Sequence, residues 1–330
     1  MSNRAGDLRQ AALRLAVMGM MALPVAPAAQ ARADVFTGAG TRTQQPELSF
    51  LPDFSGLAWI EGNLFVAVHD TKHSRGIDQP RVSLLTLPTS QTGIQAQVPQ
   101  VNWPEPHAPS HDLESIARIP GTRQMLLVES GDDSGRYRRI FLANLDRRKL
   151  MLTDFMHWPV PITNVEGSAV ARVGGQLVFL YAERAHGQPS TLIRWAPLDL
   201  QPLGLGRFAE ARFVSPGPRG GDSRPVTALE VDPAGTVYAA SALDPGRDGG
   251  PFGSRVWRIG RLALDDDGQP DLVLMADPQL IATLDGVKVE SLAIRQQTDG
   301  YPELFVGTDD ENFGGTMRLI PLSPSSTSGS

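Results

Sequence analysis

The chain has 330 residues, of which 41% are hydrophobic and 20% are charged, with a formal net charge of −6 and no cysteine. Without cysteine there can be no disulfide, no thiolate metal site and no lipid-anchored cysteine. The negative charge argues against a nucleic-acid partner, because binding phosphates requires a basic surface. The length suits one large all-β domain or two smaller ones.

The first 33 residues are predicted to be an export signal. Arg4, Arg9 and Arg14 precede a short apolar run from Leu15 to Ala22, and alanines around positions 29 to 33 offer a cleavage site. This run is too short to span a bilayer. An amphipathic N-terminal helix that is retained is the alternative. We therefore expect a periplasmic or secreted protein, with no membrane span once the signal is removed.

A short motif recurs five times, at intervals of 52 to 63 residues. The copies are rich in Gly, Ser and Ala and begin at Ser55, Glu114, Glu166, Thr227 and Glu290. Each copy leads into a Gly-, Asn- or Asp-containing turn, which is typical of a hairpin. An apolar strand follows each turn, and its near-continuous hydrophobicity indicates burial on both faces.

This period, with about four strands in each repeat, predicts an all-β fold consisting of a single β-propeller. Five blades follow from the five copies, and six is the alternative if one interval hides a degenerate blade. The small residues place the first strand of each repeat nearest the axis. The last repeat lacks an outer strand, so residues near 35–50 are expected to supply it and close the ring. The propeller would span 34–322, followed by a disordered tail at 323–330. A two-sheet sandwich would not explain the period.

One rim of this propeller is predicted to be acidic. The first strand of each repeat begins where the second ends, so residues at these two places share a rim, and the opposite rim carries mainly tight turns. Converging carboxylates repel one another unless they are protonated, paired with cations or bound to a metal. Calcium prefers such oxygen ligands, and its predicted ligands are Glu114, Glu166, Glu290, Asp309 and Asp310. The alternative is that these carboxylates are solvated rim residues balanced by neighbouring cations.

Candidate catalytic groups lie on the same rim. His111 enters it three residues before Glu114 and is the candidate general base, with Glu114 as the second catalytic residue. Arg136, Arg184 and Lys288 are predicted to orient an anionic substrate. Two histidine pairs have zinc-like spacing, at 69/73 and 107/111, but no helix is predicted there to bring the rings together. No Gly-x-Ser-x-Gly elbow occurs, so metal-activated water is the favoured nucleophile.

Several of these segments resemble a known family. Asp112–Ala117, Asn164–Ala169, Lys288–Ala293 and Thr308–Gly315 are similar to motifs of the exported β-propeller family named for phytase-like esterase activity. The likeness runs from about Phe54 to Leu322. It implies a secreted or periplasmic propeller of esterase or phosphoesterase type. In related calcium propellers, such as the gluconolactonase and paraoxonase groups, axial carboxylates hold a catalytic calcium. This chain departs from the pattern at Ser55 and Thr227, where the carboxylate is missing.

The sequence therefore predicts a calcium-binding propeller that hydrolyses a small ester or phosphoester. The alternative is a non-catalytic recognition propeller that binds an envelope protein or polymer. The five tryptophans would then either contact that partner or, as structural residues, pack between blades.

Overall fold

A computed structural model of the chain describes residues 35–36, 51–71, 80–89, 93–106, 108–131, 135–247, 249–297, 302–310 and 314–322. The chain separates into two units, Met1–Arg32 and Ala33–Ser330, and every described residue belongs to the second. The predicted signal at 1–33 and the predicted tail at 323–330 lie outside the described residues. The described part of the chain contains no α-helix, and therefore no helix long and apolar enough to cross a membrane.

The described residues form five antiparallel sheets, one for each sequence repeat. The first blade comprises β2 (Gly56–Glu61), β3 (Leu64–Val68), β4 (Val82–Thr86) and β5 (Gln95–Gln97). The second comprises β6 (Leu113–Arg118), β7 (Gln124–Glu129), β8 (Arg139–Asp146) and β9 (Lys149–His157). The third comprises β10 (Val165–Val173), β11 (Gln176–Glu183), β12 (Ser190–Leu200) and β14 (Ala209–Val214), with the short β13 (Leu203–Leu205) beside β12.

The fourth blade comprises β15 (Ser223–Val231), β16 (Thr236–Leu243), β17 (Gly253–Leu264) and β18 (Pro270–Asp285). The fifth comprises β19 (Val289–Gln296), β20 (Pro302–Thr308), β21 (Met317–Ile320) and β1 (Val35–Phe36). β1 pairs with β21, Val35 opposite Arg318 and Phe36 opposite Met317. Both the five-bladed propeller and its closure by an N-terminal strand are therefore confirmed.

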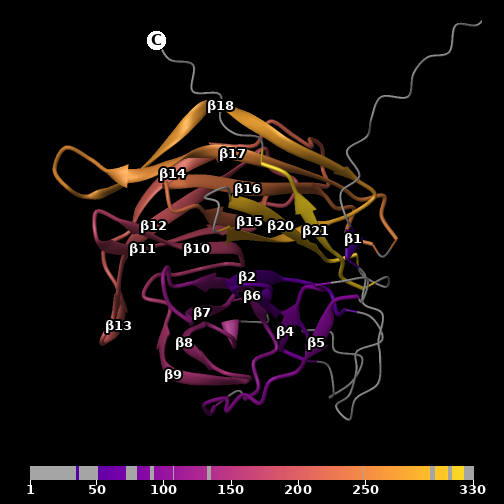
Figure 1. Cartoon of the computed structure of the whole chain (residues 1–330). Coiled ribbons are helices and arrows are strands. Elements are labelled where there is room, and N and C mark those ends of the chain that lie inside the picture. Colours follow the sequence, from indigo (N-terminus) through magenta and orange to yellow (C-terminus); the bar gives the residue numbers. More distant parts are fainter. Residues whose placement is uncertain are drawn as a thin grey trace, which may run out of the picture. The chain divides into compact units, whose positions relative to one another are not determined.

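The first strand of each blade lies at the axis. Contacts run from β2 to β6, β10, β15, β19 and back to β2, which closes the ring. Figure 1 shows β2, β6 and β10 near the middle of the domain, with the outer strands β9 and β18 at its periphery. Small residues allow this close approach: a Cβ added to Gly167 would lie 2.7 Å from the Leu229 backbone nitrogen. A pocket at the axis, lined by Gly167, Glu166 and Glu290 among others, has a volume of only about 10 Å³, roughly the space of one water.

The hydrophobic core is divided into five clusters, each between two neighbouring blades. Phe65 of the first blade and Phe305 of the fifth lie edge to face in one of them, with ring centroids 5.0 Å apart. Each second strand therefore buries both of its faces, as the continuous apolar runs indicate. Trp158, Trp195 and Trp257 are buried, as expected for tryptophans that pack between blades.

Candidate functional site

Backbone irregularities place the charged residues at the start of the innermost strands. Pairing shifts by one residue at Glu114, Glu166 and Glu290, and a longer shift follows Arg224 in the fourth blade. Such a bulge leaves an extra residue unpaired and redirects its side chain. We call this end of the axis the acidic mouth, and the end where the innermost strands run into their turns the turn mouth.

Arg224 joins three blades at the acidic mouth. Its Nη1 atom lies 2.5 Å from Glu290 Oε1 and 3.4 Å from Glu166 Oε2, and its Nη2 atom lies 2.7 Å from Asp244 Oδ2. Arg224 is itself buried, with 6% of its surface exposed. Burial opposes its charge, but the surrounding carboxylates outweigh that effect and raise the pKa of Arg224. It is therefore a permanent internal counterion.

Two further cations complete this charged group. Lys288 is buried and places Nζ 2.8 Å from Asp309 Oδ2 and 3.4 Å from Glu290 Oε1. Arg184 forms an ion pair with Glu166, with Nε 2.7 Å from Oε1, and 36% of its side chain is exposed. Lys288 is thus enclosed, whereas Arg184 also faces solvent.

The two glutamates that share Arg224 have pKa values shifted in opposite directions. Burial raises the pKa of Glu166, although Arg224 and Arg184 oppose the shift. Burial alone would raise the pKa of Glu290 as well, but the positive charges of Lys288 and Arg224 outweigh this effect and lower the pKa. The two carboxyls therefore differ in how readily they hold a proton, Glu166 more readily than Glu290.

Three more carboxylates converge between the first and second blades. Ligand oxygens of Asp70, Asp112 and Glu114 all lie within 4.8 Å of one another, and we call these residues the acidic trio. Asp112 is fully buried and accepts hydrogen bonds from Ser130 Oγ at 2.7 Å and from the Gly131 N–H at 3.1 Å. Asp70 and Asp112 are held side by side by an isolated backbone bridge. Glu114 also interacts electrostatically with Glu166, which links the trio to the Arg224 group.

The five predicted metal ligands are therefore distributed over separate environments. Glu114 lies in the acidic trio, whereas Glu166 and Glu290 bind Arg224. Asp309 binds Lys288. Asp310 accepts from the Lys288 N–H at 3.1 Å and from Thr308 Oγ1 at 2.6 Å.

The remaining predicted site residues are also separated. Lys288 and Arg184 are engaged with carboxylates, while Arg136 is exposed and makes no ion pair among the residues described. His111 Nδ1 lies 3.0 Å from Arg81 Nη2. Nε2 of the same ring lies 3.3 Å from this atom. Because arginine only donates, the unprotonated ring nitrogen of the neutral imidazole is the acceptor. The lone pair that a general base would use is therefore engaged by Arg81.

Some residues of the site were not recognised from the sequence. Arg224 was not predicted as a site residue. The signal for it is that the fourth repeat begins with Thr227 where three other repeats begin with a glutamate, and this blade contributes the cation Arg224 instead. His69 of the first zinc-like pair is 2% exposed and bonded to Asp53 O and Ser83 Oγ. It therefore has a structural role. His73 and His107 lie outside the described residues.

No protein-family model matches the chain, and no curated protein matches its sequence. Among solved structures, an exo-1,5-α-L-arabinanase from a bovine ruminal metagenomic library is 11% identical, with a TM-score of 0.48, covering 85% of this chain and 95% of that one. An endo-arabinanase from Bacillus licheniformis is 12% identical, with a TM-score of 0.47 and coverages of 82% and 92%. An endo-1,4-β-xylanase from Bacteroides thetaiotaomicron is 10% identical, with a TM-score of 0.44 and coverages of 82% and 90%. Similarity this low carries no inference about activity.

Proposed function

We propose that the acidic mouth hydrolyses a small anionic ester or phosphoester, and that the acidic trio binds calcium as a cofactor. The observation that carries this proposal is the convergence of oxygen ligands from Asp70, Asp112 and Glu114 within 4.8 Å. Carboxylate oxygens are the ligands that calcium prefers. A backbone bridge between Asp70 and Asp112 fixes these two residues relative to each other, which supports a preorganised site. This set replaces the five ligands predicted from the sequence, of which only Glu114 is retained.

Bound calcium would polarise a substrate oxygen and make a water more acidic. The other functions come from side chains of the Arg224 group. Arg184 is partly exposed beside Glu166, so its guanidinium can hold the anionic group of a substrate. Burial raises the pKa of Glu166 while the pKa of Glu290 is lowered, so Glu166 is the axial glutamate assigned to deliver a proton to the leaving oxygen. Lys288 and Arg224 keep Glu290 ionised, which balances charge around the site.

The location of the protein belongs to the same proposal. Extracellular calcium-binding modules have dissociation constants of roughly 10⁻⁴–10⁻³ M, so a weak calcium site suits a periplasmic or secreted protein. The basic and apolar residues at the N-terminus support export.

The test begins with the melting temperature of the protein, measured first with a chelator and then with added calcium. A saturable increase is expected because calcium would bind only the folded state. Glu114→Gln should abolish the increase while the fold is kept. Asp266→Asn is the matched control, because Asp266 is an exposed carboxylate far along the chain in the β17–β18 turn. If calcium and magnesium both leave the melting temperature unchanged, and elemental analysis finds no metal, the calcium proposal is wrong.

Hydrolysis is tested separately with p-nitrophenyl acetate, p-nitrophenyl phosphate and bis-p-nitrophenyl phosphate. Turnover that is lost in both Glu114→Gln and Glu166→Gln, but kept in Asp266→Asn, would support the proposed roles. If both Glu114→Gln and Glu166→Gln turn over these substrates as fast as the parent protein, the reaction does not take place at the acidic mouth.

A recognition propeller without chemistry is the second candidate. It is favoured by the ion pairs that engage two of the three axial glutamates with Arg224, because such pairs can serve the fold alone. Its partner would be an envelope protein or polymer. A melting temperature that responds to calcium, with no turnover on any ester or phosphoester, would favour this candidate over the hydrolase.

A further inference from the structure

A pocket of about 410 Å³ opens at the turn mouth, the end of the axis for which the sequence predicted little beyond tight turns. All five blades contribute to it, because Trp59, Arg118, Val170, Glu230 and Ile294 each come from a different innermost strand. Its volume is in the range of small-molecule sites. Apolar side chains of Val170 and Ile294 form part of the lining, so the pocket combines an apolar wall with a few polar groups.

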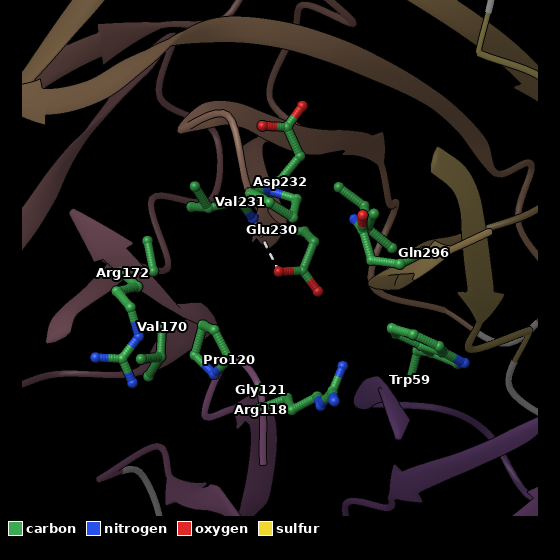
Figure 2. Close-up of a pocket in the computed structure, with 13 residues that line it drawn as sticks. Trp59, Arg118, Pro120, Gly121, Val170, Arg172, Glu230, Val231, Asp232 and Gln296 are labelled. Carbon is green, nitrogen blue, oxygen red and sulfur yellow. Dashed lines mark hydrogen bonds between the residues drawn. The ribbon is translucent and has the colours of Figure 1, made fainter. Parts of the chain in front are cut away.

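Arg118 is the cation best placed to bind a ligand in this pocket. Its guanidinium carbon lies 4.7 Å from the centroid of the Trp59 ring, and its Nε donates to Thr122 O at 3.0 Å. Stacking and this hydrogen bond fix the plane of the guanidinium. Its terminal nitrogens make no ion pair or hydrogen bond among the described residues and extend into the pocket (Figure 2). A fixed, planar guanidinium is suited to bidentate binding of a carboxylate.

Glu230 faces Arg118 across the open space (Figure 2). Its Oε1 accepts from the Val231 N–H at 2.8 Å, and no ion pair joins it to Arg118 within the described part of the chain. Burial raises the pKa of Glu230 to about 8. At neutral pH it is therefore mostly a carboxylic acid, which can donate a hydrogen bond to an anion.

The other charged groups of the lining are engaged in local structure. Asp232 accepts from the Ala234 and Thr236 N–H groups and from the Tyr238 hydroxyl. Arg172 is exposed and donates to Gly175 O at 3.1 Å. Stacking on Trp59 makes Arg118 the lining cation held in a fixed orientation, and its single charge, with two acidic residues nearby, suits a monoanion better than a dianion.

We propose that the turn mouth is a binding site for a small organic monocarboxylate, with the carboxylate on Arg118, Glu230 across from it and the apolar body against Val170 and Ile294. This site is separate from the acidic mouth and does not depend on hydrolysis there.

The test is calorimetric titration of the full-length protein at pH 7 with benzoate, gluconate and pyruvate. At least one is expected to bind saturably, and its neutral counterpart, such as benzamide for benzoate, at least tenfold more weakly. Inorganic phosphate is expected to bind more weakly than the carboxylate. Arg118→Gln should weaken the carboxylate at least tenfold, and Arg172→Gln, on the same mouth, should not. Absence of saturable binding by all three carboxylates, or equal binding by Arg118→Gln, would overturn the proposal.

A second arm does not depend on the folding of the Arg118 variant. Raising the pH through about 8 should weaken the carboxylate, because ionised Glu230 repels an anion and competes for Arg118. Arg118, Asp232 and Arg172 are the charged residues lining the pocket around Glu230. Glu230→Gln keeps the shape and a donor group, so it should bind the carboxylate with an affinity independent of pH from 7 to 9. A decrease in affinity of equal size in Glu230→Gln and in the parent protein would refute the role assigned to Glu230.

Discussion

Arg224 Nη1 lies 2.5 Å from Glu290 Oε1, so a buried ion pair joins the fourth and fifth blades at the axis. The same nitrogen also contacts Glu166 of the third blade. One guanidinium therefore compensates carboxylates from both of its neighbouring blades.

Replacement of Arg224 by methionine should destabilise the protein by roughly 3–5 kcal/mol, because it leaves buried carboxylates without their counterion. Urea unfolding measures this change. Arg136→Met is the matched control, since Arg136 is exposed and its loss should cost less than about 0.5 kcal/mol. Adding Glu290→Gln to Arg224→Met should recover part of the loss, and a double variant less stable than Arg224→Met would contradict the pairing.

Gly167 is expected to tolerate no side chain. An added Cβ would lie 2.7 Å from Leu229 N and 2.9 Å from the Ala228 backbone, and backbone atoms of the next blade cannot move aside. Gly167→Ala should cost roughly 1–3 kcal/mol from overpacking, measured by thermal or urea unfolding. Gly253→Ala is the control, because a Cβ there meets nothing within 4 Å. Equal stabilities for the two variants would show that the blades are less closely packed at the axis.

His69 should make the protein less stable in acid. Burial lowers its pKa from 6.5 to about 4, so between these values the unfolded chain binds a proton that the folded protein does not. Stability is therefore kept above pH 6.5 and decreases as the pH falls toward 4, by roughly 3 kcal/mol from this residue. Urea unfolding from pH 7 to 4.5 measures the decline, which should become smaller in His69→Gln. His157→Gln serves as the control, because this exposed side chain can be replaced with the buried ring of His69 left in place, so the decline assigned to His69 should persist.

Closure of the ring by β1 predicts a difference between two truncations. Deleting residues 1–32 leaves the pairing of Val35 with Arg318 and of Phe36 with Met317, whereas deleting residues 1–36 removes both. The longer deletion should lower the melting temperature by several degrees relative to the shorter one and expose the edge of β21. Equal melting temperatures would mean that this strand contributes nothing to closure.

Most of the fold could be predicted from local patterns. The five copies of the motif and the apolar strand after each turn follow from the sequence period and from burial on both faces, and the structure confirms them. The missing outer strand of the last repeat was enough to predict that N-terminal residues close the ring. These features depend on neighbours in the chain or on counting repeats, so a single sequence contains them.

The arrangement of charges at the two mouths could not be predicted in the same way. Glu166 and Glu290 were correctly placed near one axis end, but their partner Arg224 comes from a strand 58 and 66 residues away in the chain. At the turn mouth, Arg118, Trp59 and Glu230 occupy ordinary strand ends in three repeats and form a pocket only because the ring closes. Which charges meet depends on bulges and on the rotation between blades, and these are set by packing across the whole ring.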